Sequence, residues 1–147
     1  MVDAGYSCHE TSFGLVAVKA YSGNYNWEEA RIKCSEDGTD VKGELAAPRS
    51  PVENEWFVDK ANELGLVKFW LGVNDRDVEG EYKNQHGSLH NYFRWKTNEP
   101  TGVTVANCVQ TGGGYGYQWD DDVCSKRKNL LCTHVVGKAV ISIKIQG

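Results

Sequence analysis

The feature that most constrains how this chain can fold is its set of five cysteines, at positions 8, 34, 108, 124 and 132. None of them is spaced C-x-x-C, and no group of cysteines and histidines has the spacing of a zinc finger. Buried free thiols are one interpretation, but disulfides formed in an oxidising compartment explain the number better. Because five is odd, one cysteine must remain a thiol or bind another chain. Residues 1–5 contain no signal peptide, so the expectation is a mature, secreted extracellular chain.

Length and composition restrict the classes of function. The chain has 147 residues, of which 40% are apolar, and this favours a single domain over residues 1–147. A net charge of −4 argues against nucleic acid and against an anionic membrane surface as partners. No apolar run approaches the roughly 18 residues of a transmembrane segment. The motifs of serine hydrolases and zinc proteases are absent, so no catalytic residue is assigned and an enzyme is not expected.

Local patterns predict regular elements in the first half of the chain. The strongest of them is a helix that begins with a capping box, formed by Ser50 and Glu53, and ends at Gly65. A second helix has its apolar residues on one face, and two short segments rich in Val, Leu or Phe have the composition of strands. The predicted elements are helices at 27–34 and 51–64 and strands at 15–21 and 68–73.

The second half is mostly irregular. Residues 74–128 contain only short strand-like pieces, at 92–95, 108–110 and 117–119, before a further strand at 130–135. A long irregular stretch in a compact domain is usually either functional or disordered, and its tryptophans and cysteines favour an ordered, functional one. The tail, 137–147, includes an alternating apolar segment that predicts an extra strand, which would pair within the domain or with a second chain.

Acidic residues in this irregular half are candidates for binding a hard cation. Asp75, Asp77 and Glu79 lie close together, but position twelve of an EF-hand loop would be His86, so an EF-hand is rejected. Three aspartates follow Trp119, and Glu99 lies in a loop before Pro100. Since Ca²⁺ takes six to eight oxygens, these carboxylates suit it if their loops converge. The alternative is that they form solvated acidic loops.

Seven segments, in this order and spacing, resemble the C-type lectin-like domain family over residues 13–134. They are WEEARIKC at 27–34, LAAPRSPVENE at 45–55, FWLGVND at 69–75, WKTNEP at 95–100, NCV at 107–109, WDDDVC at 119–124 and LC at 131–132. The resemblance implies an α+β fold with two antiparallel sheets, two helices and a long ordered loop region. It implies the disulfides Cys34–Cys132 and Cys108–Cys124. The partner that a longer family form has for Cys8 falls near Val18 or Lys19, so Cys8 is expected to remain a thiol or to link two chains.

The resemblance also implies a Ca²⁺ ion that chelates two sugar hydroxyls. Its ligands carry over to Glu99, Thr101, Asp120 and Asp121, where Thr101 and Asp120 replace other oxygen donors of the family. The glutamate usual before the third core cysteine falls at Ala106, which has no side-chain oxygen. An auxiliary Ca²⁺ site carries over to the residues Asp75, Glu79 and Asn107. Apart from the resemblance, Tyr115, beside a glycine-rich tip, is a candidate for stacking on a sugar.

These residues leave more than one function open. The first expectation is a secreted, Ca²⁺-dependent carbohydrate-binding lectin that binds a glycan or glycoprotein. The loss of an oxygen at Ala106 and the change at Thr101 favour instead a protein-binding domain of the same fold. A third alternative is binding to a mineral or ice surface. A homodimer, through Cys8 or through the tail at 137–147, is a further expectation.

Overall fold

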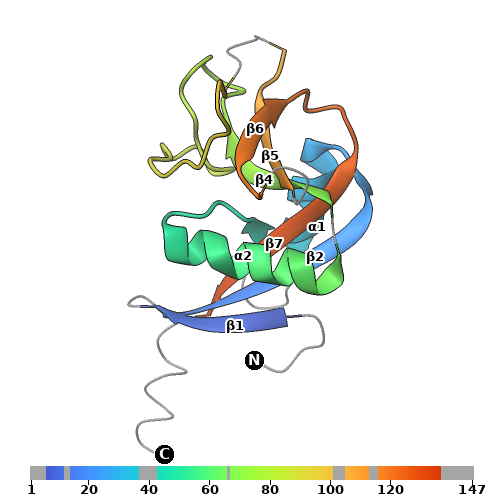
Figure 1. Ribbon diagram of the computed structural model, residues 1–147, viewed down its shortest axis with the longest axis vertical. Helices are drawn as coiled ribbons and strands as arrows, with labels where there is room; N and C mark the ends of the chain where they lie inside the picture. The colour runs from blue at the N-terminus through green and yellow to red at the C-terminus, as the bar shows by residue number, and fades with distance from the viewer. Residues whose placement is uncertain are drawn as a thin grey trace, which may run out of the picture.

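The structure is a computed structural model that describes residues 6–11, 14–36, 43–65, 67–100, 105–112 and 116–136. These residues form two helices, seven strands and long connecting loops (Figure 1). The elements are β1 (Tyr6–Thr11), β2 (Gly14–Tyr25), α1 (Trp27–Glu36), β3 (Glu44–Leu45), α2 (Pro51–Leu64), β4 (Lys68–Asn74), β5 (Cys108–Gly112), β6 (Trp119–Asp122) and β7 (Lys128–Val136).

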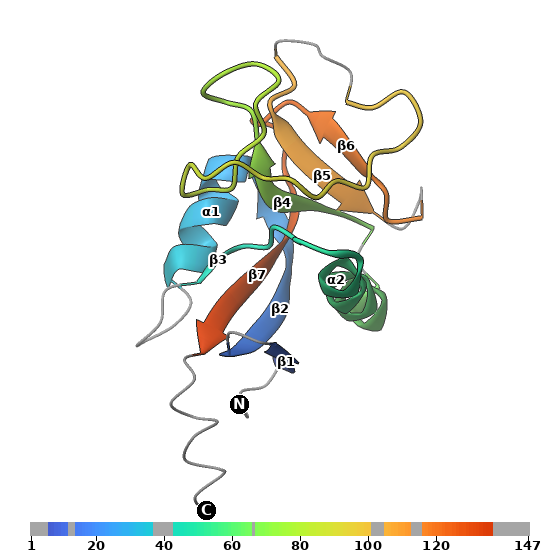
Figure 2. The ribbon, with the colours of Figure 1, turned by 90° about the vertical axis from the view of Figure 1, so that its left-hand side faces the viewer.

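The strands form two antiparallel groups. One contains β1, β2, β7 and the short β3, and the other contains β4, β5 and β6. A two-residue parallel pairing between β4 and β7 joins them into one hydrogen-bonded sheet in the order β1-β2-β7-β4-β5-β6. In Figure 2, α1 and α2 lie on opposite sides of β2 and β7, and the second group lies with the long loops at the end away from β1. The α+β fold that the sequence predicts is confirmed, with the difference that its two sheets are joined.

Apolar side chains fill the space between the sheet and the two helices. The cluster beside α2 includes Phe57, Phe69, Leu71 and Trp119, and the cluster beside α1 includes Trp27, Trp70 and both cysteines of the first disulfide. The indole rings of Trp27, Trp70 and Trp119 are fully buried. Full burial of a tryptophan side chain contributes on the order of 4 kcal/mol, so these three rings account for much of the core.

Both helices begin where polar side chains satisfy their first amide groups. Ser50 Oγ accepts a hydrogen bond from the Glu53 amide at 3.2 Å, and Gly65, in the left-handed region at φ 65°, ends α2. Asn26 and Glu29 form the reciprocal pair at α1, with distances of 2.8 and 3.0 Å. The predicted helix starts are therefore confirmed, and α1 runs two residues beyond its prediction because Ser35 and Glu36 continue its last turn.

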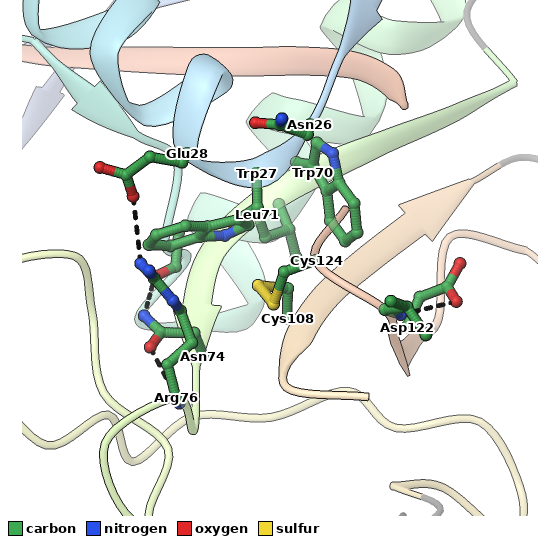
Figure 3. The surroundings of a disulfide bond; sticks show 12 residues. Asn26, Trp27, Glu28, Trp70, Leu71, Asn74, Arg76, Cys108, Asp122 and Cys124 are labelled. Carbon is green, nitrogen blue, oxygen red and sulfur yellow. Dashed lines mark hydrogen bonds and ion pairs between the residues drawn. A yellow bond between two sulfur atoms is a disulfide. The ribbon is translucent and has the colours of Figure 1, made fainter. Parts of the chain in front are cut away.

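The two disulfides link the parts of the chain that carry the loops. They join Cys34 to Cys132 and Cys108 to Cys124, as the resemblance implies. Figure 3 shows the second disulfide beside the indole rings of Trp27 and Trp70. Cys124 is further fixed because its carbonyl oxygen accepts a hydrogen bond from the Trp27 amide at 3.0 Å.

Some sequence expectations differ from the structure. The strand β1 has no counterpart among the predictions, because its own pattern is weakly apolar and only its hairpin pairing with β2 makes it a strand. The segment 92–95 is not a strand: it contributes a single bridge from Trp95 to Trp119, and its aromatic side chains pack on the core instead. The predicted tail strand, within 137–147, lies outside the described residues. Among the described residues, no helix has the length and apolar character needed to cross a bilayer.

Candidate metal centre

The position of β6 is determined by its first residue. Trp119 is fully buried, and its indole Nε1 donates to Asn54 Oδ1 on α2 at 3.2 Å. Its main-chain amide donates to the Arg94 carbonyl at 2.7 Å, and its carbonyl accepts from the Lys96 amide at 2.9 Å. The start of β6 is thus held between α2 and the loop at 94–96. This arrangement brings the aspartates that follow Trp119 next to the loop that contains Glu99.

Three carboxylates converge at this point. Glu99, Asp120 and Asp121 each offer an oxygen, and these oxygens all lie within 4.8 Å of one another. Asp121 is 7% exposed, while Glu99 and Asp120 are half-buried. Burial raises the pKa of Glu99 to about 7, and the negative charges of Asp121 and Asp120 contribute to the same shift. The group therefore stores electrostatic repulsion that a divalent cation would relieve.

Buried oxygens without hydrogen-bond partners gather around the same group. Within the described ranges they belong to Glu99 (Oε1), Asp75 (Oδ1), Asn107 (Oδ1) and Gln110 (Oε1). A buried acceptor left without a partner costs roughly 1–3 kcal/mol, so such atoms are rare in stable proteins. The oxygen ligands of a hard cation are also buried acceptors without hydrogen-bond partners before the ion binds. Three of these four residues, Glu99, Asp75 and Asn107, are predicted ligands.

The residues predicted for an auxiliary site lie beside the first group. Asp75 is 2% exposed, its Oδ2 accepts from the Gly80 amide at 2.9 Å, and its own amide donates to the Asn107 carbonyl at 3.0 Å. The Asp75 carboxylate raises the pKa of Glu79, and Asp121 adds to that shift. Asp121 is therefore close to Asp75 and Glu79 as well as to Glu99 and Asp120.

Other predicted residues are not part of this set. Ala106 is almost fully buried and offers no side-chain oxygen, as expected. Thr101 and the sugar-stacking candidate Tyr115 lie outside the described residues. Asp122 forms ion pairs with Lys128 and Lys126, both 2.9 Å long. Although burial alone would raise the pKa of Asp122, the hydrogen bonds from these lysines hold it below its usual range.

Two residues at the site were missed by the sequence analysis. Gln110 is 4% exposed, and its Nε2 donates to Asp120 Oδ1 at 2.9 Å. Lys96 places its Nζ 3.8 Å from Asp120 Oδ2. The signal that could have found Gln110 is the hairpin formed by β5 and β6, because this pairing puts Gln110 directly opposite Asp120. No local signal indicates Lys96, because its contact depends on how the 94–96 loop crosses β6.

The fold and this site define a class of protein: a disulfide-linked α+β binding domain that presents carboxylates from strand β6 and from the neighbouring loop. The chain belongs to the C-type lectin domain family, since the family model described as "Lectin C-type domain" matches residues 23–134. This family consists of binding proteins and not of enzymes, in agreement with the expectation from the sequence.

Two relatives show the same similarity in sequence. A tetranectin-like protein from Carcharhinus perezii is 32% identical over 119 residues, which cover 80% of this chain and 69% of that protein. Lectin BRA-3 from Megabalanus rosa is 32% identical over 107 residues, which cover 72% of this chain and 63% of that protein. The chain therefore spans about two thirds of the length of these relatives.

Solved structures show the same fold. Human lithostathine superimposes with a TM-score of 0.81 at 19% identity, covering 92% of both chains. A calcium-independent type II antifreeze protein superimposes with a TM-score of 0.77 at 21% identity, covering 92% of this chain and 95% of that protein. At such identities the likeness concerns the fold alone.

Proposed function

We propose that this chain is a secreted lectin that binds carbohydrate through Ca²⁺. The observation that carries the proposal is the convergence of Glu99, Asp120 and Asp121, with oxygens within 4.8 Å, next to buried oxygens that have no partners. Membership of the C-type lectin domain family and similarity to Lectin BRA-3 support the same function. The two disulfides support secretion, because such bonds persist in oxidising compartments.

The three carboxylates would hold the ion and orient the sugar together. Each carboxylate has two oxygens, so Glu99 and Asp121 can each direct one toward the ion and use the other to accept from a sugar hydroxyl. Asp120 would offer Oδ2 to the ion, because its Oδ1 accepts from Gln110. Ca²⁺ prefers six to eight oxygens, so two vicinal hydroxyls of a sugar would add to the oxygens of these residues, and water or main-chain carbonyls would supply the rest. Residues Asp75, Glu79 and Asn107 would hold a second ion, which supports the loop from the other side of Asp121.

The substitution at Asp120 supports Ca²⁺ binding despite the missing oxygen at Ala106. The family's usual ligand set has an amide at the position of Asp120 and a carboxylate at the position of Ala106. Here the carboxylate is at Asp120 instead, so the number of carboxylates that face the ion stays at three. The charge lost at one position is thus restored at another, where Gln110 holds it with a hydrogen bond of 2.9 Å.

Calorimetric titration with Ca²⁺, followed by mannose and galactose, tests the proposal. We expect Ca²⁺ binding and sugar binding that EDTA reverses. Asp121→Asn should weaken Ca²⁺ binding by at least about tenfold, because it removes a charge from the least exposed of the three converging carboxylates. Glu55→Gln, an exposed residue of α2 outside the site, is the matched control and should bind as the natural chain does. Absence of Ca²⁺ binding, or sugar binding that survives EDTA, contradicts the proposal.

A domain that binds a protein or a solid surface without Ca²⁺ is the second candidate. The absence of an oxygen at Ala106 favours it, and so does the fold shared with a protein described as a calcium-independent type II antifreeze protein. This candidate predicts a flat Ca²⁺ titration together with an intact fold in EDTA, which separates it from the lectin in one experiment.

We also propose that Cys8 links two copies of the chain. Cys8 is exposed and takes part in neither disulfide. It lies in β1, which pairs only with β2 among the described strands and so forms an edge of the sheet. An exposed edge strand is a natural place for two chains to meet. Electrophoresis without reductant should show a dimer that reductant or Cys8→Ser converts to monomer, and a monomer in every lane contradicts this proposal.

A further inference from the structure

The face of β6 that carries Asp120 is rich in lysine. Side chains alternate along a strand, so Asp120 and Asp122 lie on one face and Asp121 on the other. Lys96 lies 3.8 Å from Asp120 Oδ2, and both Lys126 and Lys128 lie 2.9 Å from oxygens of Asp122. We call Lys96, Lys126 and Lys128 the lysine face. It is a local departure from a chain whose net charge is −4.

The lysine face carries more positive than negative charge. Its three ammonium groups pair with two carboxylates, those of Asp120 and Asp122, which leaves one positive charge. A Ca²⁺ ion bound beside Asp120 would add to this positive charge. Asp121, on the other face of β6, lies close to Asp75 and Glu79.

Lys96 is the ammonium group that the ion would affect most. Asp120 Oδ1 already accepts from Gln110, so Oδ2 is the oxygen left for a cation, and Oδ2 is also the oxygen that Lys96 approaches. A cation on Oδ2 would repel the ammonium group and weaken its ion pair. The Lys96 side chain is 34% exposed and Lys126 is 59% exposed, so both can reach a ligand from the solvent side. An anionic group of the ligand would then replace Asp120 as the partner of Lys96.

We propose that this site selects acidic saccharides, in which a carboxylate or sulfate group lies beside the chelated hydroxyls and is bound by Lys96 with help from Lys126. The inference rests on the proposed function, because it requires the ion to be bound first. Lysine suits either anion, since its ammonium group acts as a compact charge with three donors that fits oxyanions of different shape.

Binding of matched sugars in calorimetry tests the inference. The probes are mannose, mannose 6-sulfate and mannuronic acid, together with the corresponding galactose, galactose 6-sulfate and galacturonic acid. Each is titrated at about 150 mM salt, where unspecific attraction between exposed charges is screened beyond about 8 Å. We expect at least one acidic probe to bind about tenfold more tightly than its neutral parent in Ca²⁺. The sulfate and the carboxylate probes show which anion the site takes.

Variants show whether the lysine face causes the preference. In Lys96→Gln the ratio of acidic to neutral affinity should fall to about one, and in Lys126→Gln it should fall in part. Lys33→Gln, which makes the same change of charge on α1, should keep the full ratio. Equal affinities for acidic and neutral probes, or a ratio that survives in Lys96→Gln, overturn the inference while the lectin function stands. Acidic probes that bind equally well in EDTA overturn it too. If no probe binds in a Ca²⁺-dependent way, the proposed function itself fails.

Discussion

At the scale of single residues, the carboxyl group of Glu99 should make both the stability of the fold and Ca²⁺ binding depend on pH. Its pKa is raised to about 7, chiefly by burial and then by Asp121 and Asp120. A carboxyl group with a raised pKa in the folded state stabilises the fold at low pH, and this contribution is lost as the pH rises through 7. Ca²⁺ requires the ionised form, so the proton and the ion compete for the same group.

The first prediction follows from this competition. The apparent dissociation constant for Ca²⁺ should rise about tenfold for each pH unit below 7, because a single proton must leave. In EDTA the melting temperature should fall between pH 5 and pH 8, and saturating Ca²⁺ should remove that fall. Calorimetry and thermal denaturation measure the two effects. Glu99→Gln should flatten the fall in EDTA, and a Ca²⁺ affinity that is constant from pH 5.5 to 8 contradicts the assignment.

Gln110 gives a second prediction at this scale. Its Nε2 holds Asp120, while its Oε1 is buried without a partner. In Gln110→Leu the unpartnered oxygen disappears, so the melting temperature in EDTA should stay the same or rise. Asp120 loses its donor, so Ca²⁺ affinity should fall several-fold. A purely structural residue would instead lower the melting temperature and leave the affinity unchanged, and that outcome contradicts a role in positioning Asp120.

At the scale of elements, α2 supports β6 through two hydrogen bonds between side chains. Asn54 Oδ1 accepts from the buried indole of Trp119 at 3.2 Å, and Asn62 Oδ1 accepts from the Tyr117 hydroxyl at 2.6 Å. Asn54 thus contacts the first residue of β6, and Asn62 contacts the segment that leads into it. The helix has a function in addition to covering the core, because it determines where the aspartates of β6 lie.

The third prediction separates these two functions of α2. Asn54→Leu should destabilise the fold by about 1–3 kcal/mol, since the indole N–H loses its partner, and should also weaken Ca²⁺ binding. Ser50→Ala removes the N-cap of the same helix at a cost of about 1 kcal/mol, but it should leave the Ca²⁺ affinity unchanged. Chemical denaturation and calorimetry measure both quantities. Equal effects of the two variants on affinity would show that α2 acts only through stability.

At the scale of the whole molecule, the two disulfides constrain different parts of the chain. Cys34–Cys132 closes a loop with a sequence separation of 98 residues, and Cys108–Cys124 closes one of 16. The chain-entropy model assigns them roughly 4–5 and about 3 kcal/mol. Both loops contain β6, but only the shorter one begins and ends at the β5–β6 hairpin, where Cys108 lies opposite Asp122.

The fourth prediction contrasts the two bonds. Replacing both Cys34 and Cys132 by serine should lower the free energy of unfolding more than replacing both Cys108 and Cys124. The second pair should have the larger effect on Ca²⁺ affinity, because it tethers the two ends of the β5–β6 hairpin. Urea denaturation and calorimetry of both double variants test this. The natural chain should unfold in one transition if residues 1–147 form a single domain, as we propose, and two separate transitions would contradict that.

The sequence by itself determined the elements whose signals are local. A capping residue and a left-handed glycine act over a few positions, which is why α2 was predicted from Ser50 to Gly65. The order of motifs identified the family and, through it, the two disulfides and the carboxylates of the site. These features depend on residue type and spacing along the chain, and both can be read without coordinates.

Only the tertiary structure decided which of these residues meet. Glu99 approaches Asp120 and Asp121 because the buried Trp119 anchors β6 between α2 and the 94–96 loop. The contacts of Asp120 with Gln110 and Lys96 follow from the pairing of β5 with β6 and from the path of that loop. The strand β1 is likewise defined by its partner β2, with which it forms a hairpin. The contacts of Glu99 and Lys96 with the aspartates of β6 join residues that are distant in sequence, and their free energy comes from packing and burial, which no local pattern records.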